Sequence, residues 1–113
     1  MNANLSGREI DTIVARVVMV ARPRRVMVFG SYAKGRATGR SDLDLLVVVA
    51  GDEAPRPRPS DFAPYLGGWI VPVDIHVVTE EELREYGRQE HHFLHSVLRS
   101  GRTLYQHDGG GVT

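Results

Sequence analysis

The chain contains no cysteine, which excludes disulfide bonds and thiolate metal sites. It also lacks an excess of charge, because 14 basic residues balance 14 acidic ones. A dedicated nucleic-acid binder usually carries a basic excess, so we expect no direct binding to nucleic acid. No apolar run is long enough to cross a bilayer and no signal peptide opens the chain. These absences predict a cytoplasmic protein with no membrane partner.

The length of 113 residues is that of one domain, which can bury a core but has little room for a second substrate-binding lobe. We predict a single domain over residues 1–106 and a flexible tail over residues 107–113. Its first element is a helix, because Ser6 and Glu9 have the spacing of a capping box and apolar residues follow at helical intervals. Pro23 ends this helix.

Three apolar runs predict buried strands at residues 26–29, 42–49 and 70–78. Pro72 indicates that the third strand begins at an edge or irregularly. A second capping box at Thr79 and Glu82 opens a helical region that runs to about residue 99, with Gly87 as a candidate break. A short strand is predicted at residues 103–106. Strands separated by helices predict an α/β or α+β fold, with a small mixed sheet flanked by helices.

Three aspartates lie inside or beside these apolar strands. Side chains alternate along a strand, so Asp42 and Asp44 share one face, and Asp74 on another strand can join them. Buried carboxylates are costly, and no lysine or arginine lies inside either strand to neutralise them. Either their pKa values rise or cations bind. Magnesium suits an all-oxygen site completed by phosphate ligands, and two such ions can assist an in-line displacement.

A Gly-Ser turn precedes the aspartates and fits the same chemistry. Gly30 lets the backbone approach a bulky anion, and Ser31 offers a hydroxyl and an amide N–H to a terminal phosphate. Lys34 and Arg40 are positioned to supply positive charge to a nucleotide. Gly-Ser and Asp-x-Asp are each common in proteins, where they usually form turns or surface features. Here a strand, Gly-Ser, a polar loop and Asp-x-Asp follow one another, and this order favours a functional site.

These residues resemble the minimal nucleotidyltransferase (MNT) family of the DNA polymerase β superfamily. The family pattern is Gly-Ser, ten residues, then Asp-x-Asp, and ten residues separate Ser31 from Asp42 here. Asp74 matches the third carboxylate of the family, in a Val-Asp-Ile context. The fuller motif is matched by Gly30, Ser31, Ala33, Lys34, Gly35, Ser41, Asp42, Asp44 and Leu45. The resemblance extends from about residue 26 to residue 105 and implies a polymerase β-like nucleotidyltransferase fold.

The resemblance also implies roles for the matched residues. Asp42 and Asp44 would hold two Mg²⁺ ions that bind the triphosphate of ATP. Asp74 would complete the catalytic metal site and help to deprotonate an acceptor hydroxyl. Gly30 and Ser31 would bind the outgoing phosphates as a nucleoside monophosphate is transferred and pyrophosphate leaves.

Minimal members of this family are commonly encoded with a HEPN-domain ribonuclease and act as its antitoxin. The resemblance therefore implies a protein adenylyltransferase that performs AMPylation of a tyrosine hydroxyl on a HEPN toxin. Two alternatives stay open: a non-catalytic antitoxin that masks the toxin by stoichiometric binding, and a nucleotidyltransferase for an aminoglycoside-like small molecule. A homo- or hetero-oligomer also stays open, since an open sheet can pair.

Several residues have two interpretations. The Pro-Arg run at residues 55–59 is either a solvated loop or a contact for phosphate or an acidic partner. His91 and His95 have the spacing of a zinc pair on a helix, but no third ligand is near, and with His92 they also fit an exposed helix face or a partner contact. His76 either lines the cleft beside Asp74 or is an ordinary strand residue. Tyr32 either touches the nucleotide or packs in the core.

Overall fold

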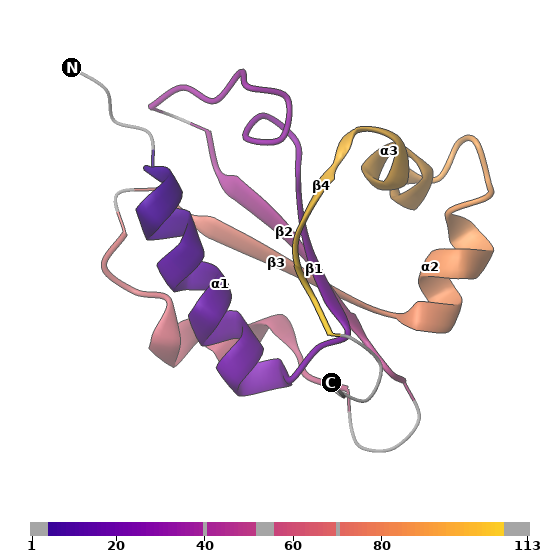
Figure 1. The fold of residues 1–113 in the computed structure, drawn as a ribbon, viewed down its shortest axis with the longest axis horizontal. Coiled ribbons are helices and arrows are strands. Elements are labelled where there is room, and N and C mark those ends of the chain that lie inside the picture. The colour runs from indigo at the N-terminus through magenta and orange to yellow at the C-terminus, as the bar shows by residue number, and fades with distance from the viewer. Residues whose placement is uncertain (1–4, 40, 52–55, 70, 108–113) are drawn as a thin grey trace.

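A four-stranded mixed sheet forms the middle layer of the molecule, with helices on both faces (Figure 1). The computed structural model describes residues 5–39, 41–51, 56–69 and 71–107. Its elements are α1 (Gly7–Ala21), β1 (Arg25–Phe29), β2 (Leu43–Val49), the 3₁₀ helix η1 (Pro59–Tyr65), β3 (Val73–Thr79), α2 (Glu80–Tyr86), α3 (Phe93–Ser100) and β4 (Arg102–Gln106). The predicted α/β class is confirmed.

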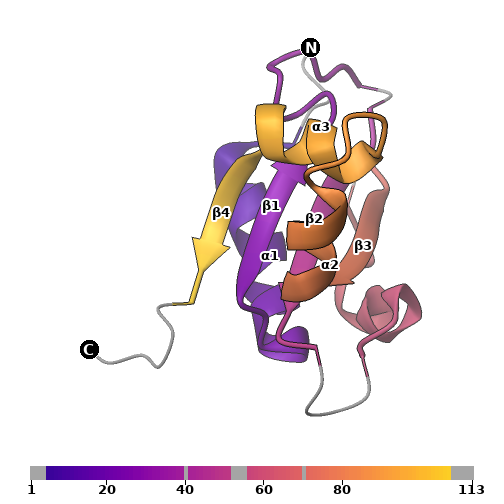
Figure 2. The ribbon, with the colours of Figure 1, turned by 90° about the vertical axis from the view of Figure 1, so that its right-hand side faces the viewer.

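The strand order is β3-β2-β1-β4, so β1 and β2 are central and the other two strands form the edges (Figure 2). β1 pairs antiparallel with both β2 and β4, whereas β2 and β3 are parallel. α1 and η1 cover one face of the sheet, and α2 and α3 cover the other (Figure 1). Because β2 is central, it is the strand that both layers of helices bury.

The predicted capping box at the start of α1 is present. The backbone N–H of Glu9 donates to Ser6 Oγ at 3.1 Å, and the N–H of Ser6 donates to Glu9 Oε1 at 2.8 Å. At the other end Arg22 adopts the left-handed conformation with φ 46°, and its N–H donates to the carbonyl of Val18. Pro23 follows and cannot continue the helix. These contacts satisfy backbone groups that a helix end otherwise leaves unpaired.

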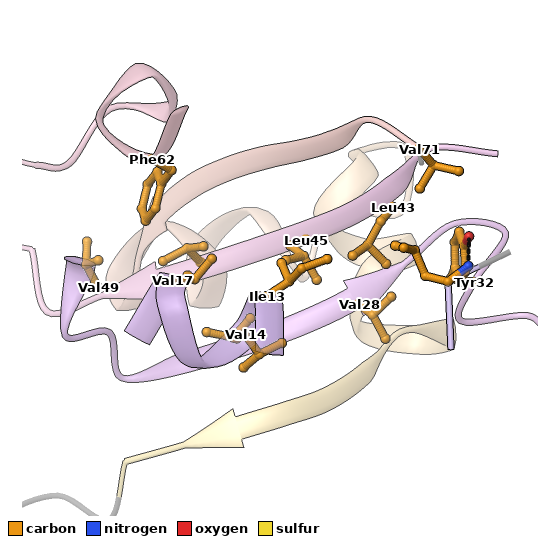
Figure 3. Close-up of a cluster of buried hydrophobic side chains, with 13 residues drawn as sticks. Ile13, Val14, Val17, Val28, Tyr32, Leu43, Leu45, Val49, Phe62 and Val71 are labelled. Atoms are coloured by element: carbon orange, nitrogen blue, oxygen red, sulfur yellow. Dashed lines mark hydrogen bonds between the residues drawn. The ribbon is translucent and has the colours of Figure 1, made fainter. Parts of the chain in front are cut away.

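The larger core lies between α1 and the sheet (Figure 3). It contains Ile13, Val14 and Val17 from α1, Val28 from β1, Leu43, Leu45 and Val49 from β2, and Phe62 from η1. Burying one such side chain contributes about 1.5–3 kcal/mol relative to leaving it exposed. This layer fixes the position of β2 from one side.

A second, smaller core lies between the sheet and the pair α2 and α3. It contains Met27, Leu46, Val48, Val78, Leu83, Leu94 and Val97. Every residue of β2 is buried by one core or the other, apart from Asp44, which is half-buried. A strand packed on both faces thus interrupts its apolar run at this one carboxylate.

Two predicted strands begin later than the sequence indicates. β2 starts at Leu43, so Asp42 lies just before the strand. β3 starts at Val73, and Ile70 of the predicted strand lies outside the described residues. Pro72 has no N–H to donate to the ladder, but its carbonyl accepts from the N–H of Leu43 at 2.9 Å. The parallel pairing therefore begins at this bond, directly beside Asp42.

The predicted helical region after β3 is two helices, as Gly87 indicated. α2 ends at Tyr86, and the N–H of Gly87 donates to the carbonyl of Leu83 at 2.9 Å. α3 then begins at Phe93 and ends before Gly101. No helix among the described residues is long and apolar enough to span a bilayer.

The predicted last strand is β4, which ends at Gln106. The following N–H, of His107, donates to the carbonyl of Arg24 at 2.8 Å. Residues 108–113 of the predicted tail lie outside the described residues.

Candidate active site

The parallel pairing of β2 with β3 brings two of the predicted carboxylates together. Asp44 is the register partner of Asp74, and on its other side Asp44 faces Phe29 of β1. Register partners on neighbouring strands point to the same face of a sheet. Two carboxylates separated by 29 positions of sequence therefore lie side by side on the face that α2 and α3 partly cover.

Asp42 lies near this pair, although it is outside the strand. It is exposed, whereas Asp44 is half-buried. Burial raises the pKa of Asp44, and the charges of Asp74 and Asp42 raise it further, while the charge of His76 acts in the opposite direction. Asp44 thus interacts electrostatically with both of the other aspartates, and this repulsion favours either a proton or a cation at Asp44.

No lysine or arginine forms an ion pair with these aspartates in the part of the chain that the structure describes. The ion pairs found there join Arg24 to Glu80 and Arg56 to Glu82. Within the same residues, no three His, Cys, Asp or Glu side chains are grouped closely enough to hold a metal ion. The arrangement is a carboxylate pair with a third carboxylate nearby. In donor chemistry, this all-oxygen set fits Mg²⁺, which takes one or two carboxylates and completes its shell with water and phosphate oxygens.

Gly30 lies directly against the carboxylate pair. Its φ of +73° is in the left-handed region, and a Cβ added to it would be 2.6 Å from Asp44 Oδ2. Both facts require glycine here. The carbonyl of Gly30 accepts from the N–H groups of Ala33 and Lys34 at 3.1 and 3.2 Å. The chain from Ser31 is therefore a hydrogen-bonded turn and not a helix, and it follows immediately after Gly30, whose Cα lies against Asp44.

The remaining predicted residues of this turn differ in position. Lys34 is exposed on the turn, and Arg40 lies outside the described residues. Tyr32 is buried, with 8% of its surface exposed, and its hydroxyl accepts from the N–H of Leu5 at 3.0 Å. Of the two interpretations of Tyr32, the structure favours packing.

His76 borders the carboxylates and lies in an aromatic cluster. Its ring is 5.3 Å from Phe29 in an edge-on arrangement and 5.9 Å from Phe93. Phe93 begins α3 and is 46% exposed, and its ring is 6.2 Å from that of Phe29 on β1.

The histidine pair of the sequence does not lie on one helix. His91 is in the turn before α3, and His92 caps this helix by accepting the N–H of Leu94 at 3.1 Å. Nδ1 of His95 is 2.9 Å from the carbonyl of Gly87. The spacing of four residues predicted a shared face only for a continuous helix, and the turn after Gly87 removes it.

The Pro-Arg run contacts α2 and leads into η1. Arg56 Nη2 is 3.0 Å from Glu82 Oε2, which ties the run to the start of α2. Beyond it, η1 and β3 line a pocket of about 340 Å³ on the α1 side of the sheet; Pro59, Ala63, Leu66 and Asp74 are in its lining. The side chains of Asp44 and Asp74 share the opposite face of the sheet, so this pocket is separate from the carboxylate pair.

Comparisons with known proteins identify the family and the fold. The sequence profile of the nucleotidyltransferase domain family matches residues 8–102. A protein of Sulfolobus solfataricus, provisionally called a nucleotidyltransferase, is 28% identical; the alignment covers 67% of this chain and 68% of that chain, with a TM-score of 0.51. No curated protein matches the chain.

A second similar structure is a toxin–antitoxin with AMP-PNP. It is 20% identical over 88% of this chain and 76% of that chain, with a TM-score of 0.52. At this identity the likeness concerns the fold.

Proposed function

The chain belongs to the nucleotidyltransferase domain family, and on this premise we propose that it transfers AMP from ATP to a hydroxyl group of a partner protein. The partner that we propose is a HEPN-domain toxin, which the transfer would neutralise. The observation that carries the proposal is the register of Asp44 with Asp74 beside Gly30. This arrangement puts like charges next to a turn that approaches them closely, and bound Mg²⁺ with a triphosphate would relieve the repulsion.

The residues have separate roles in this proposal. Asp42, Asp44 and Asp74 would hold two Mg²⁺ ions, which neutralise phosphate charge and orient the triphosphate when bound. Gly30 leaves space for the phosphates next to Asp44, and Ser31 donates hydrogen bonds to their oxygens. Lys34 and Arg40 supply further positive charge from the same loop.

The chemistry is an in-line displacement at the α-phosphorus. The acceptor oxygen forms a bond to the α-phosphorus, the bond from this phosphorus to the bridging oxygen of the β-phosphate breaks, and pyrophosphate leaves. Asp74 accepts the proton of the acceptor hydroxyl, because it is an exposed carboxylate on the edge strand β3 beside Asp44, where an acceptor can approach. Positioning and charge neutralisation account for most of the rate in such transfers.

The identity of the acceptor is supported by one comparison. The fold is similar to that of a toxin–antitoxin solved with AMP-PNP, an analogue of ATP. We assign the acceptor as a tyrosine hydroxyl of the toxin.

The direct test uses labelled ATP, Mg²⁺ and the protein encoded next to this chain. We expect one AMP on a partner tyrosine, seen as a mass increase of one nucleotide, and none with Asp44→Asn. Glu90→Gln is the matched control, since Glu90 is an exposed carboxylate in the turn between α2 and α3 and should leave the transfer unchanged. An unmodified partner in the presence of wild-type protein, ATP and Mg²⁺ contradicts the proposal.

The same variants separate catalysis from masking by contact. If the chain acts as a catalyst, Asp42→Ala with Asp44→Ala fails to neutralise the toxin even at equal dose. If this double variant protects as well as the wild type, binding alone is sufficient and the proposed transfer is not the basis of neutralisation.

A further inference from the structure

An arginine-lined pocket lies at the opposite end of the sheet from the aspartates. Its volume is about 360 Å³, and its lining includes Arg24 and Arg25 at the start of β1 and Arg84 on α2. Val48 of β2 also lines it, four residues after Asp44 and therefore roughly 13 Å along the strand. The pocket is on the side covered by α2 and α3, which Figure 2 views from the front. It is thus distinct from the candidate active site.

The charges around this pocket are not balanced. Glu80 is the one carboxylate in its lining, and its Oε1 is 3.9 Å from Arg24 Nε, at the outer limit of an ion pair. Arg25 donates from Nε to Thr103 Oγ1 at 3.0 Å, which fixes its direction without neutralising it. Among the described residues, neither Arg25 nor Arg84 forms an ion pair with a carboxylate. The lining arginines therefore leave an excess of two positive charges.

The floor and wall of the pocket are apolar. Val48 and Leu83 belong to the smaller core, and Leu98 of α3 is 40% exposed at the wall. Arginine side chains bind phosphate through paired N–H donors, and apolar walls accommodate the body of a ligand. A phosphate monoester carries a charge of about −1.5 to −2 at pH 7, which matches the excess at the pocket.

We propose that this arginine pocket binds a phosphate monoester with an apolar or aromatic body. The phosphate lies between the guanidinium groups of Arg24, Arg25 and Arg84, and the body lies on Leu83 and Leu98. The site is independent of the nucleotide chemistry at the aspartates.

Titration with phenyl phosphate at low salt tests the proposal. Calorimetry on the full chain is expected to show saturable binding, and amide resonances of Leu83 and Leu98 should shift in NMR spectra. Arg84→Gln should weaken binding by about tenfold, the usual scale for one charge-assisted hydrogen-bonded partner. Arg88→Gln is the matched control, because Arg88 is exposed one turn later and does not line the pocket.

A second ligand and two more variants identify the chemical class of the ligand and the place where it binds. Phenylacetate, a monoanion of similar shape, should bind several-fold more weakly than phenyl phosphate. Leu98→Glu places a negative charge at an exposed wall position without disturbing the core and should also weaken binding. Ser31→Ala, at the candidate active site, should leave the affinity unchanged.

Four results would overturn the proposal. These are the absence of saturable binding, equal affinity in wild type and Arg84→Gln, equal affinity for phenylacetate, and loss of binding in Ser31→Ala. The last would place the phosphate at the Gly-Ser turn. Circular dichroism of each variant establishes that a loss of binding does not reflect unfolding.

Discussion

Asp44 is the one residue of β2 that is only half-buried, and its side chain is a carboxylate. All its neighbours along β2 are buried, and its register partner is another carboxylate. The alternation of a strand predicts that Asp42 and Asp44 share one face, but β2 starts at Leu43, so strand alternation places only Asp44. Its meeting with Asp74 depends on the parallel pairing of β2 with β3, which no local pattern encodes and which the resemblance only implied.

Replacing this carboxylate should raise stability while it removes activity. The pKa of Asp44 is raised by burial and like charges, so the folded chain holds this proton more tightly than the unfolded chain. The contribution of Asp44 to stability is therefore largest at acid pH and is lost as pH rises through the raised pKa. In EDTA, Asp44→Asn should melt a few degrees above wild type at neutral pH, and the difference should close toward about pH 4. Calorimetric melting at several pH values checks this.

The activity of the same variant is measured in parallel. We expect nucleotide transfer by Asp44→Asn to fall by a factor on the order of 10²–10³. If Asp44→Asn melts below wild type at neutral pH in EDTA, the Asp44 charge does not destabilise the fold and the prediction is contradicted.

Gly30→Ala isolates the close approach between the turn and Asp44. The new Cβ would be 2.6 Å from Asp44 Oδ2, so the carboxylate must move. Gly35→Ala is the matched control, because Gly35 has φ +69° but no atom within 4 Å of the added Cβ. Both variants should lose about 1–2 kcal/mol from the left-handed backbone, but only Gly30→Ala should also lose transfer activity. Urea unfolding and a transfer assay separate the two effects; equal activities would rule out the steric argument.

At the scale of elements, the helix caps and the break between α2 and α3 could be predicted from the sequence. The first residues of β2 and β3 were predicted less well. The spacing of Thr79 and Glu82 was sufficient to place the start of α2, since both bonds of the box are local. The strand was predicted from residue 70, three positions before β3 begins at Val73, because the apolar residues before Pro72 continue the pattern although proline cannot donate to the ladder. The zinc-pair interpretation of His91 and His95 assumed one continuous helix, but His91 lies in the turn before α3.

The cap of α2 has a testable energy. Thr79 Oγ1 accepts from the N–H of Glu82 at 3.0 Å, and Thr79 itself is buried. Thr79→Ala should reduce the free energy of unfolding by about 1 kcal/mol, while Thr79→Ser, which keeps the hydroxyl, should lose less. Urea unfolding measures both; equal losses would assign the effect to the methyl group.

A pH dependence follows from the same box. The N–H of Thr79 lowers the pKa of Glu82, and the hydrogen bond and charge of Arg56 lower it further. This contribution to stability is present above the ordinary glutamate pKa and is lost as pH falls through the lowered value. Glu82→Gln should therefore be less stable than wild type at neutral pH, with the difference shrinking in acid, as melting curves can show.

The junction between α3 and β4 requires glycine for space and not for conformation. Gly101 has φ −78°, but an added Cβ would be 2.6 Å from the carbonyl oxygen of Val97 and 2.9 Å from that of Val28. Gly101→Ala should cost about 1–3 kcal/mol, because backbone atoms on both sides must move. Gly7→Ala, with nothing within 4 Å, should not destabilise. Denaturant unfolding of the pair tests this, and an unchanged Gly101→Ala would contradict it.

On the scale of the whole molecule, helices pack on both faces of the sheet and hold the strands that carry Asp44 and Asp74. Ligands that bind the folded chain alone should stabilise all of it. At about 100 times its dissociation constant, ATP with Mg²⁺ should add about 2.7 kcal/mol. The increase should disappear with EDTA and in the double variant Asp42→Asn with Asp44→Asn. Thermal melting with and without each component measures it, and a shift that persists in the double variant would point to another binding site.

The fold class could be predicted from the sequence, whereas the pockets on the surface could not. Alternating helices and strands were enough for the class of fold, because each element carries its own apolar period. The arginine pocket could not be anticipated, since it combines residues from β1, β2, α2, α3 and β4, which only the tertiary fold brings together.

The bond from the N–H of Leu5 to the Tyr32 hydroxyl has a practical consequence. It ties the first described residue of the chain to the side chain next to Ser31. An affinity tag fused at the N-terminus is close in sequence to this hydrogen bond, so a recombinant protein prepared for assay should carry its tag elsewhere or have it cleaved.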